Sequence, residues 1–152
     1  ELSNLKVNKT SNLLCEIDSN PFSWIYLPSE SYTPHRIIMT GNFSKHNNNS
    51  SLDSSRSTCT LEFSGDYTSD EMYFQLEKVP FNLKAIAHNR GSDAYVIQDK
   101  DTRKRIQTAK NILSKYNIFL LGRFAEWEYM NMDIAINNSL KLCERFKQIN
   151  TF

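Results

Sequence analysis

Strand-forming segments follow one another closely through the first part of the chain. Four segments rich in β-branched or aromatic residues, with partial alternation, lie at residues 13–17, 22–27, 36–43 and 58–63. Turn-forming residues separate them, for example at residues 19–21. Parallel neighbours in a sheet need a crossover of a dozen or more residues, usually a helix. The short spacers therefore predict antiparallel neighbours.

Three helices are predicted after these strands. The first begins at a capping box formed by Thr68 and Glu71 and ends before Pro80. The second begins after Asp99 or Asp101, and the third covers residues 134–149. The apolar stripes expected to be buried are Thr102, Ile106, Ala109, Leu113 and Tyr116 in the second helix, and Met132, Ile136, Leu140, Cys143, Phe146 and Ile149 in the third.

Two more strands are predicted between the first and second helices, at residues 83–87 and 94–98. These elements together indicate the fold class α+β, mainly an antiparallel sheet with about three helices. No internal repeat or boundary is evident, so residues 1–152 are expected to form a single domain.

Composition limits the classes of partner. The net charge is +1, which gives no electrostatic reason to expect nucleic acid as a partner. Cys15, Cys59 and Cys143 are odd in number and lack paired spacing, which argues against a disulfide scaffold or a metal site and fits a cytoplasmic protein. No apolar run approaches the ~20 residues that span a bilayer.

The segment at residues 118–133 carries the strongest functional signal. A short apolar run, predicted to be a strand, precedes Gly122 and Arg123, and an aromatic-rich loop then leads to a helix with Asn131 as its N-cap. A glycine permits close backbone approach to a ligand. The arginine offers a planar fork for phosphate, and a helix start offers free N–H groups. These parts predict one side of an anion or dinucleotide site.

Residues 122–133 also resemble the C-terminal flavin-contacting motif of UDP-galactopyranose mutases and their FAD-dependent amine-oxidase-like relatives. That motif reads Gly-Arg-(Phe/Leu)-Gly-x-(Trp/Tyr)-x-Tyr-x-(Asn/Asp)-Met-Asp, and Ala125 replaces its second glycine here. Upstream, residues 24–28, 35–37, 42–44 and 94–97 are similar to family segments in the same order, with Val96 in place of a proline.

The resemblance implies roles for individual residues. It places Arg36 and Arg123 in catalysis, Tyr95, Tyr129 and Trp127 at the substrate, and Gly122, Arg123, Asn131, Met132 and Asp133 beside the FAD cofactor. The two arginines are then expected on one concave face, with the tyrosines nearby. Taken alone, Arg36 fits a solvent-facing strand position, Trp127 and Tyr129 fit a hydrophobic plug, and Asp133 fits a helix-dipole partner. Arg123 has an independent case, because it lies between a glycine turn and a helix start.

The glycine-rich turn that holds the FAD pyrophosphate in such flavoproteins is not found. The four glycines, at positions 41, 65, 91 and 122, form no Gly-x-Gly-x-x-Gly cluster. We therefore expect this chain to be the C-terminal part of a larger flavoprotein, with the parent's N-terminal FAD-binding domain as its partner. The isolated chain is expected to fold without holding FAD and without activity of its own.

Two classes of parent enzyme stay open. One resembles the mutases, which contract the ring of a nucleotide sugar for cell-surface polysaccharide synthesis. The other is an amine-oxidase-like oxidoreductase acting on another small molecule.

Overall fold

The computed structural model describes residues 2–149, which pack as two compact units. The sheet unit contains residues 8–94, and the helical unit contains residues 2–7 together with residues 95–149. The chain passes from one unit to the other inside a strand on both occasions, in β1 (Lys6–Asp18) and in β5 (Lys84–Ile97).

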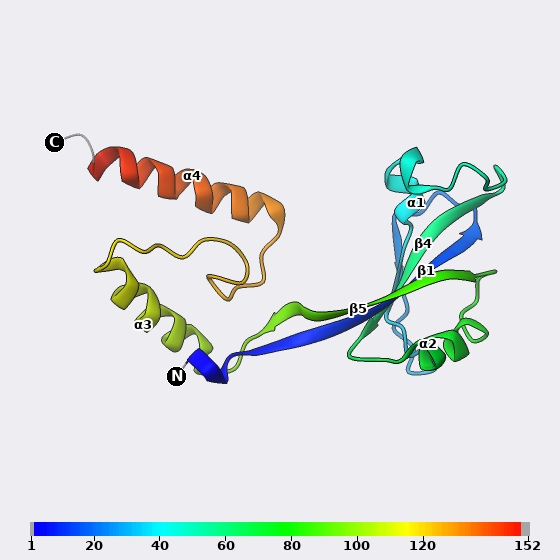
Figure 1. Cartoon of the computed structure of the whole chain (residues 1–152), viewed down its shortest axis with the longest axis horizontal. Coiled ribbons are helices and arrows are strands. Elements are labelled where there is room, and N and C mark those ends of the chain that lie inside the picture. The colour runs from blue at the N-terminus through cyan, green and yellow to red at the C-terminus, as the bar shows by residue number, and fades with distance from the viewer. Residues whose placement is uncertain (1, 150–152) are drawn as a thin grey trace. The chain divides into compact units, whose positions relative to one another are not determined.

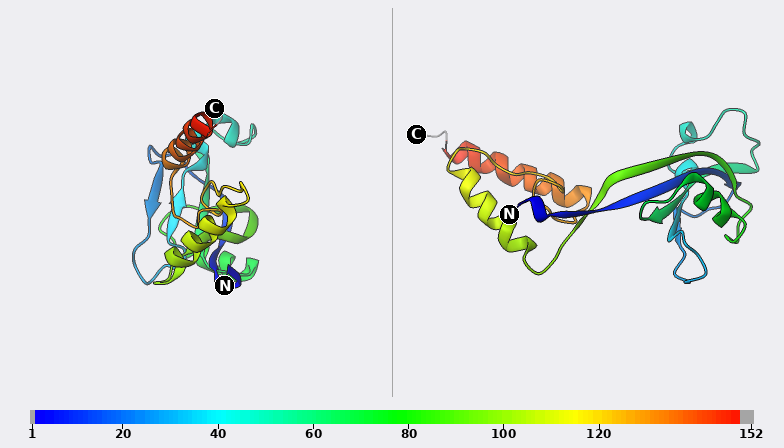
Figure 2. Two further views of the ribbon diagram at one scale, coloured as in Figure 1. Left: turned by 90° about the vertical axis from the view of Figure 1, so that its left-hand side faces the viewer. Right: turned by 60° about the horizontal axis from the view of Figure 1, so that its bottom comes forward.

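A five-stranded antiparallel sheet organises the first unit, as the turn spacing predicts (Figure 1). Its other strands are β2 (Trp24–Tyr26), β3 (Arg36–Ile38) and β4 (Arg56–Ser64). The strand order is β2-β3-β4-β1-β5, and β1 and β5 run side by side (Figure 2). The α+β fold class predicted from the sequence is therefore confirmed.

The pairing register shows which residues share each face of this sheet. Ile25, Ile37, Leu61 and Leu13 lie opposite one another across four strands. The last three of these side chains are fully buried, and Ile25 packs against them. The next row along the strands is Tyr26, Arg36, Glu62 and Asn12. Because side chains alternate between faces, this second row lies on the side away from the core.

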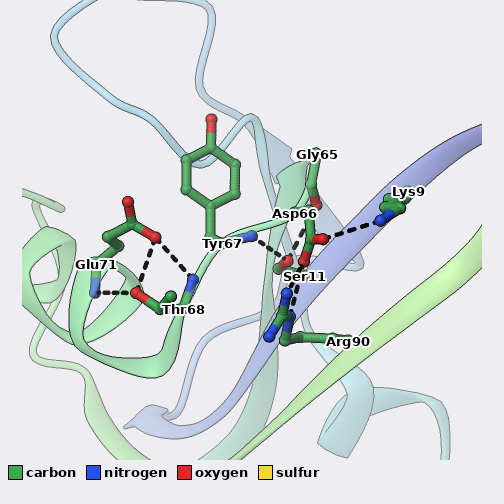
Figure 3. Close-up of polar contacts among 8 residues, drawn as sticks. All are labelled: Lys9, Ser11, Gly65, Asp66, Tyr67, Thr68, Glu71 and Arg90. Atoms are coloured by element: carbon green, nitrogen blue, oxygen red, sulfur yellow. Dashed lines mark hydrogen bonds and ion pairs between the residues drawn. The ribbon is translucent and has the colours of Figure 1, made fainter.

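Helix α2 (Ser69–Leu76) contributes Met72 to the core of the sheet unit. It begins at the predicted capping box, in which Thr68 accepts from the Glu71 N–H and Glu71 accepts from the Thr68 N–H. The turn before it is tied to the sheet (Figure 3). The Asp66 carboxylate in this turn accepts hydrogen bonds from Lys9 of β1 and from Arg90 of β5.

The buried Ser11 hydroxyl donates to the Gly65 carbonyl and accepts from the Tyr67 N–H (Figure 3). These two hydrogen bonds hold the turn at residues 65–67 against β1. Lys9 and Ser11 of β1, together with Arg90 of β5, thus hold the turn from which α2 begins.

The strand predictions for the sheet unit need correction in two places. The strand predicted at residues 36–43 ends at Ile38 and is followed by α1 (Thr40–Phe43) and a 3-10 turn, η2 (Lys45–Asn47). Asn48 explains this change, because its side chain donates to the Gly41 carbonyl and accepts from the Thr58 N–H. A Cβ on Gly41 would lie only 2.1 Å from the Asn48 Oδ1, so the loop closes over a residue without a side chain.

The strands predicted at residues 83–87 and 94–98 are one continuous strand, β5. Asn89, Arg90 and Gly91 appear turn-forming in the sequence, but they lie within this strand. Arg90 reaches Asp66 on one side, and the Gly91 backbone passes close to Thr10 of β1. Contacts with distant parts of the chain override the local turn signal.

The helical unit contains α3 (Thr102–Ser114), α4 (Met132–Ile149) and a 3-10 turn, η1 (Leu2–Asn4) (Figure 1). The prediction of a strand at residues 118–121 is wrong. Asn117 takes a left-handed conformation, with φ of 58°, and the Ile118 N–H donates to the Leu113 carbonyl. The segment is thus bound to the end of α3. Among residues 2–149, no helix combines the length and apolar character needed to cross a bilayer.

The apolar stripe of α4 is exposed, contrary to the prediction that it is buried. Met132, Ile136 and Leu140 are 83%, 61% and 60% exposed, and Cys143 is exposed as well. Phe146 is partly covered, because its ring meets the Phe119 ring edge-on, with the ring centroids 5.0 Å apart. The side chain of Ile149 lies outside the described residues. Periodicity predicts an apolar helix face but does not say what covers it.

Candidate ligand-binding site

The loop at residues 122–131 connects the 118–121 segment to α4 and carries most of the predicted site. Gly122 has φ of 94°, a conformation that L side chains rarely adopt, and a Cβ there would meet no atom within 4 Å. The glycine is therefore required by the backbone and not by crowding. Two turns follow, closed by hydrogen bonds from the Glu126 N–H to the Gly122 carbonyl and from the Glu128 N–H to the Arg123 carbonyl.

Glu126 anchors this loop to both helices. Its carboxylate accepts from Lys110 of α3 at 3.1 Å, from Asn138 of α4 at 3.1 Å and from the Gly122 N–H at 3.2 Å. Burial raises the pKa of the Glu126 carboxyl, but these three hydrogen bonds together hold the pKa below its ordinary range. Glu126 is consequently ionised in neutral solution and fixes the loop by charge.

Sequence reasoning missed Glu126. It stands at a position that is variable in the family motif, so the motif gives it no role. The available signal was its place between a glycine turn and an aromatic residue in a loop flanked by two amphipathic helices.

Trp127 closes the other side of the loop. Its φ is 51°, its indole N–H donates to the Ile97 carbonyl at 3.3 Å, and its own carbonyl accepts from Gln98 at 3.0 Å. The ring meets Phe124 edge-on at 6.4 Å. Trp127 also lines a cavity of about 170 Å³ beside α3, together with Ile106 and Lys110. These contacts give Trp127 a packing role, and its contact with substrate stays a prediction.

Arg123, Tyr95 and Tyr129 lie together and form what we call the Arg123 cluster. The guanidinium centre is 4.9 Å from the centroid of the Tyr129 ring and 5.9 Å from that of Tyr95, within the range of cation–π attraction. The two rings are 6.1 Å apart and inclined by 31°. Tyr95 comes from β5 and Tyr129 from the loop, so residues distant in the sequence meet around one positive charge.

Two hydrogen bonds orient the Arg123 side chain. Its Nε and Nη2 both donate to the Met130 carbonyl, at 3.1 and 2.6 Å. Within residues 2–149, no carboxylate pairs with this guanidinium, and its Nη1 has no acceptor. The Tyr129 side chain is 64% exposed. The cluster therefore combines a held positive charge, an unused donor and an accessible phenol.

The predicted cofactor residues flank this cluster in the chain. Gly122 directly precedes Arg123, while Asn131, Met132 and Asp133 form the start of α4. The Asn131 carbonyl accepts the first helical hydrogen bond, from the Ala135 N–H at 3.1 Å, which puts Asn131 at the predicted N-cap position. Asp133 lies in the first turn, where a carboxylate complements the helix dipole.

Arg36 belongs to the sheet unit. Its Nη2 donates to Glu62 Oε1 at 2.6 Å, and the same oxygen contacts His35 Nε2 at 2.9 Å. Glu62 is largely buried, so this is a partly desolvated ion pair. Arg36 and Arg123 lie in different units, and their meeting at one ligand stays a prediction.

Comparison with known proteins supports the fold. No family model matches the chain, and no curated protein sequence matches it. Among solved structures, the chain is similar to a crystal structure of reduced UDP-galactopyranose mutase, with a TM-score of 0.67 and 16% sequence identity. The match covers 84% of this chain and 30% of that one, so the chain spans less than a third of its length. At this identity the likeness shows a shared fold.

Proposed function

We propose that this chain is the substrate-binding, C-terminal part of a FAD-dependent, UDP-galactopyranose mutase-like enzyme. The Arg123 cluster carries the proposal, because it offers a held guanidinium whose Nη1 has no acceptor and whose charge no carboxylate neutralises within the described residues. The similarity of fold to a reduced UDP-galactopyranose mutase supports it, as does the motif at residues 122–133.

Arg123 and the two tyrosines have distinct tasks in this proposal. The Met130 carbonyl fixes the guanidinium, so that its remaining donor is aimed before the ligand arrives. Tyr129 adds a phenol donor, and the Tyr95 ring, which lies beside that of Tyr129, adds a second cation–π contact to the charge. A diphosphate ligand gains charge-assisted hydrogen bonds from such a group.

The start of α4 fits a cofactor with an anionic or electron-rich edge. Gly122, Asn131, Met132 and Asp133 would lie beside FAD, with Gly122 permitting close approach and the helix N-terminus supplying N–H donors. FAD supplies the electron-pair chemistry when bound, and the chain's residues position the substrate and offset its charge. The pyrophosphate of FAD would be held by the parent's N-terminal domain.

One observation favours the second candidate, an amine-oxidase-like oxidoreductase. Arg36 is paired with the largely buried Glu62, which reduces the positive charge that it offers to a ligand. A dianionic diphosphate would then have Arg123 as its main cationic partner from this chain. A substrate with less negative charge suits that arrangement better.

Arg123 substitutions in the flavin-containing parent test the proposal. Supplied with UDP-galactopyranose under reducing conditions, the parent should form the furanose product. Arg123→Ala should lower kcat/KM by about 30- to 1000-fold, equivalent to roughly 2–4 kcal/mol. Arg123→Lys should recover only part of this, because an ammonium lacks the planar fork.

Arg103→Ala is the matched control, since Arg103 is a largely exposed arginine of α3 and should leave kcat/KM nearly unchanged. Flavin reduction by an amine without furanose would select the oxidoreductase. Unaltered kinetics of Arg123→Ala with either substrate would refute the site.

A further inference from the structure

Cys15 and Cys59 face each other at the centre of the sheet unit. They are direct partners in the antiparallel pairing of β1 and β4. Both side chains have 0% exposure and point to the core face, beside Leu13, Ile17 and Leu61. A single buried cysteine is explained by packing alone, but two on the same face of adjacent strands are also within reach of a covalent bond.

We propose that Cys15 and Cys59 close a reversible disulfide across β1 and β4 when the chain is oxidised. The structure has both cysteines free. The reaction joins two neighbouring strands of the five-stranded sheet, and it is independent of the proposed ligand site.

The hydrogen-bond pattern predicts the geometry of this disulfide. The Gly65 N–H donates to the Lys9 carbonyl, and the Ser19 N–H donates to the Ser55 carbonyl, so each of these opposed pairs is joined by a direct hydrogen bond. Such pairs recur at every second residue, and Cys15–Cys59 falls in the same series. Opposed residues of this type have Cα atoms about 5.5 Å apart, within the range that disulfides use.

The Cβ atoms of such a pair are less favourably placed. They lie toward the wide end of the cross-strand range, about 5.5 Å, whereas a relaxed disulfide prefers about 3.8 Å. The strands must approach slightly to form the bond, which strains it. Strained disulfides are more easily reduced than structural ones. The bond should therefore be labile and reversible.

The reaction balances with a small peroxide as the oxidant. One thiol is oxidised by hydrogen peroxide to a sulfenic acid, with release of water. The second thiol displaces the hydroxyl group as a second water, and the S–S bond forms. Two S–H bonds are lost and the peroxide accepts two electrons. The hydrogen bond with Cys15, and then burial, raise the pKa of the Cys59 thiol, so the reaction should be slow in the native state.

The experiment uses the full chain with Cys143→Ser, which removes the exposed thiol of α4 and leaves Cys15 and Cys59. After treatment with hydrogen peroxide, thiols are titrated under denaturing conditions and peptides are mapped without reduction. The expected result is loss of both thiols, a linked Cys15–Cys59 peptide and a mass lower by two hydrogens. Millimolar glutathione should then restore both thiols.

Cys15→Ala in the same background is the matched control, because its single remaining thiol has no partner and should give no linked peptide. If this variant does not fold, the Cys143→Ser chain still shows whether the linked peptide forms, since its core is unaltered. Two thiols that survive peroxide treatment prolonged many-fold beyond the time that oxidises Cys143 of the unmodified chain would overturn the proposal. Conversion to sulfinic acid without a linked peptide would overturn it as well.

Discussion

At the scale of single residues, Glu126 determines the shape of the candidate site more than any residue expected to touch ligand. It connects the Gly122 backbone with α3 and α4 through one carboxylate. Arg123 follows Gly122 directly, so the position of the guanidinium depends on this anchor. Arg123, the side chain proposed to bind ligand, and Glu126, which anchors its loop, are three residues apart in the sequence.

Glu126→Gln should destabilise the helical unit by about 1–3 kcal/mol, because the charge-assisted hydrogen bonds from Lys110 and Asn138 are lost or weakened. Urea unfolding followed by helical circular dichroism measures the change. Glu128→Gln is the control, since the contact of Glu128 with Arg103 is long, at 3.7 Å, and its hydrogen bond from Gln98 can also be accepted by a glutamine carbonyl. Equal effects of the two substitutions would show that Glu126 is not an anchor.

Asp99 gives the start of α3 a dependence on pH. Hydrogen bonds from Thr102 and from the Asp101 N–H lower the pKa of the Asp99 carboxyl from its ordinary 3.8 to about 2. The folded form therefore binds this proton more weakly than the unfolded form. The stabilising contribution should be complete above pH 3.8 and lost as the pH falls through about 2. NMR titration of Asp99 checks this, and Asp99→Asn should remove the dependence.

Sequence reasoning singled out Arg123 as a candidate because its neighbours carry the signal: a glycine before it and a helix start after it. The Tyr95–Arg123–Tyr129 contact was expected from the family resemblance, and the structure brings these three side chains together. Periodicity and spacing could not have found it, because Tyr95 comes from another element. Glu126 escaped notice because its partners Lys110 and Asn138 lie on two different helices.

At the scale of elements, local sequence signals predicted where helices and strands begin better than where they end. The capping box at Thr68 begins α2 as expected, since both of its hydrogen bonds form within four residues. The break expected within β5 does not occur, because its flanking partners Asp66 and Thr10 lie far away in the sequence. Likewise β3 ends early where Asn48 folds back on Gly41. Long-range hydrogen bonds decide these boundaries.

Thr68→Ala should destabilise the sheet unit by about 1 kcal/mol, because the substitution removes the hydroxyl that accepts from the Glu71 N–H. Thr68→Ser keeps that hydroxyl and should retain most of the stability. Denaturant unfolding of both variants, fitted with the same dependence of the unfolding free energy on denaturant concentration, gives the difference in stability. Similar losses in both would show that packing of the Thr68 methyl matters more than the cap.

At the scale of the whole molecule, burial is distributed unevenly. The sheet unit holds the hydrophobic core, while the apolar stripe of α4 is exposed. Amphipathic periodicity predicted the helix itself, and α4 does span the expected residues. What covers its apolar face depends on groups outside the helix, which periodicity does not specify.

Substitution of two isoleucines of the helical unit tests the difference between the exposed face of α4 and the buried face of α3. Ile136→Ala, on the exposed stripe of α4, should change the free energy of unfolding by less than about 0.5 kcal/mol. Ile106→Ala, on the buried face of α3, should cost about 2–5 kcal/mol. Both are measured by chemical denaturation of the full chain. A large loss for Ile136→Ala would mean that the stripe is covered in solution.

The discontinuous make-up of the helical unit has a consequence for synthesis. Residues 8–94 contain the whole core cluster in one uninterrupted stretch, whereas the helical unit needs residues 2–7 and residues 95–149 together. Because domains fold as the nascent chain emerges, the sheet unit can acquire its core while α3 and α4 are still being translated. The Arg123 cluster is then assembled last, when its loop and the end of β5 have both left the ribosome.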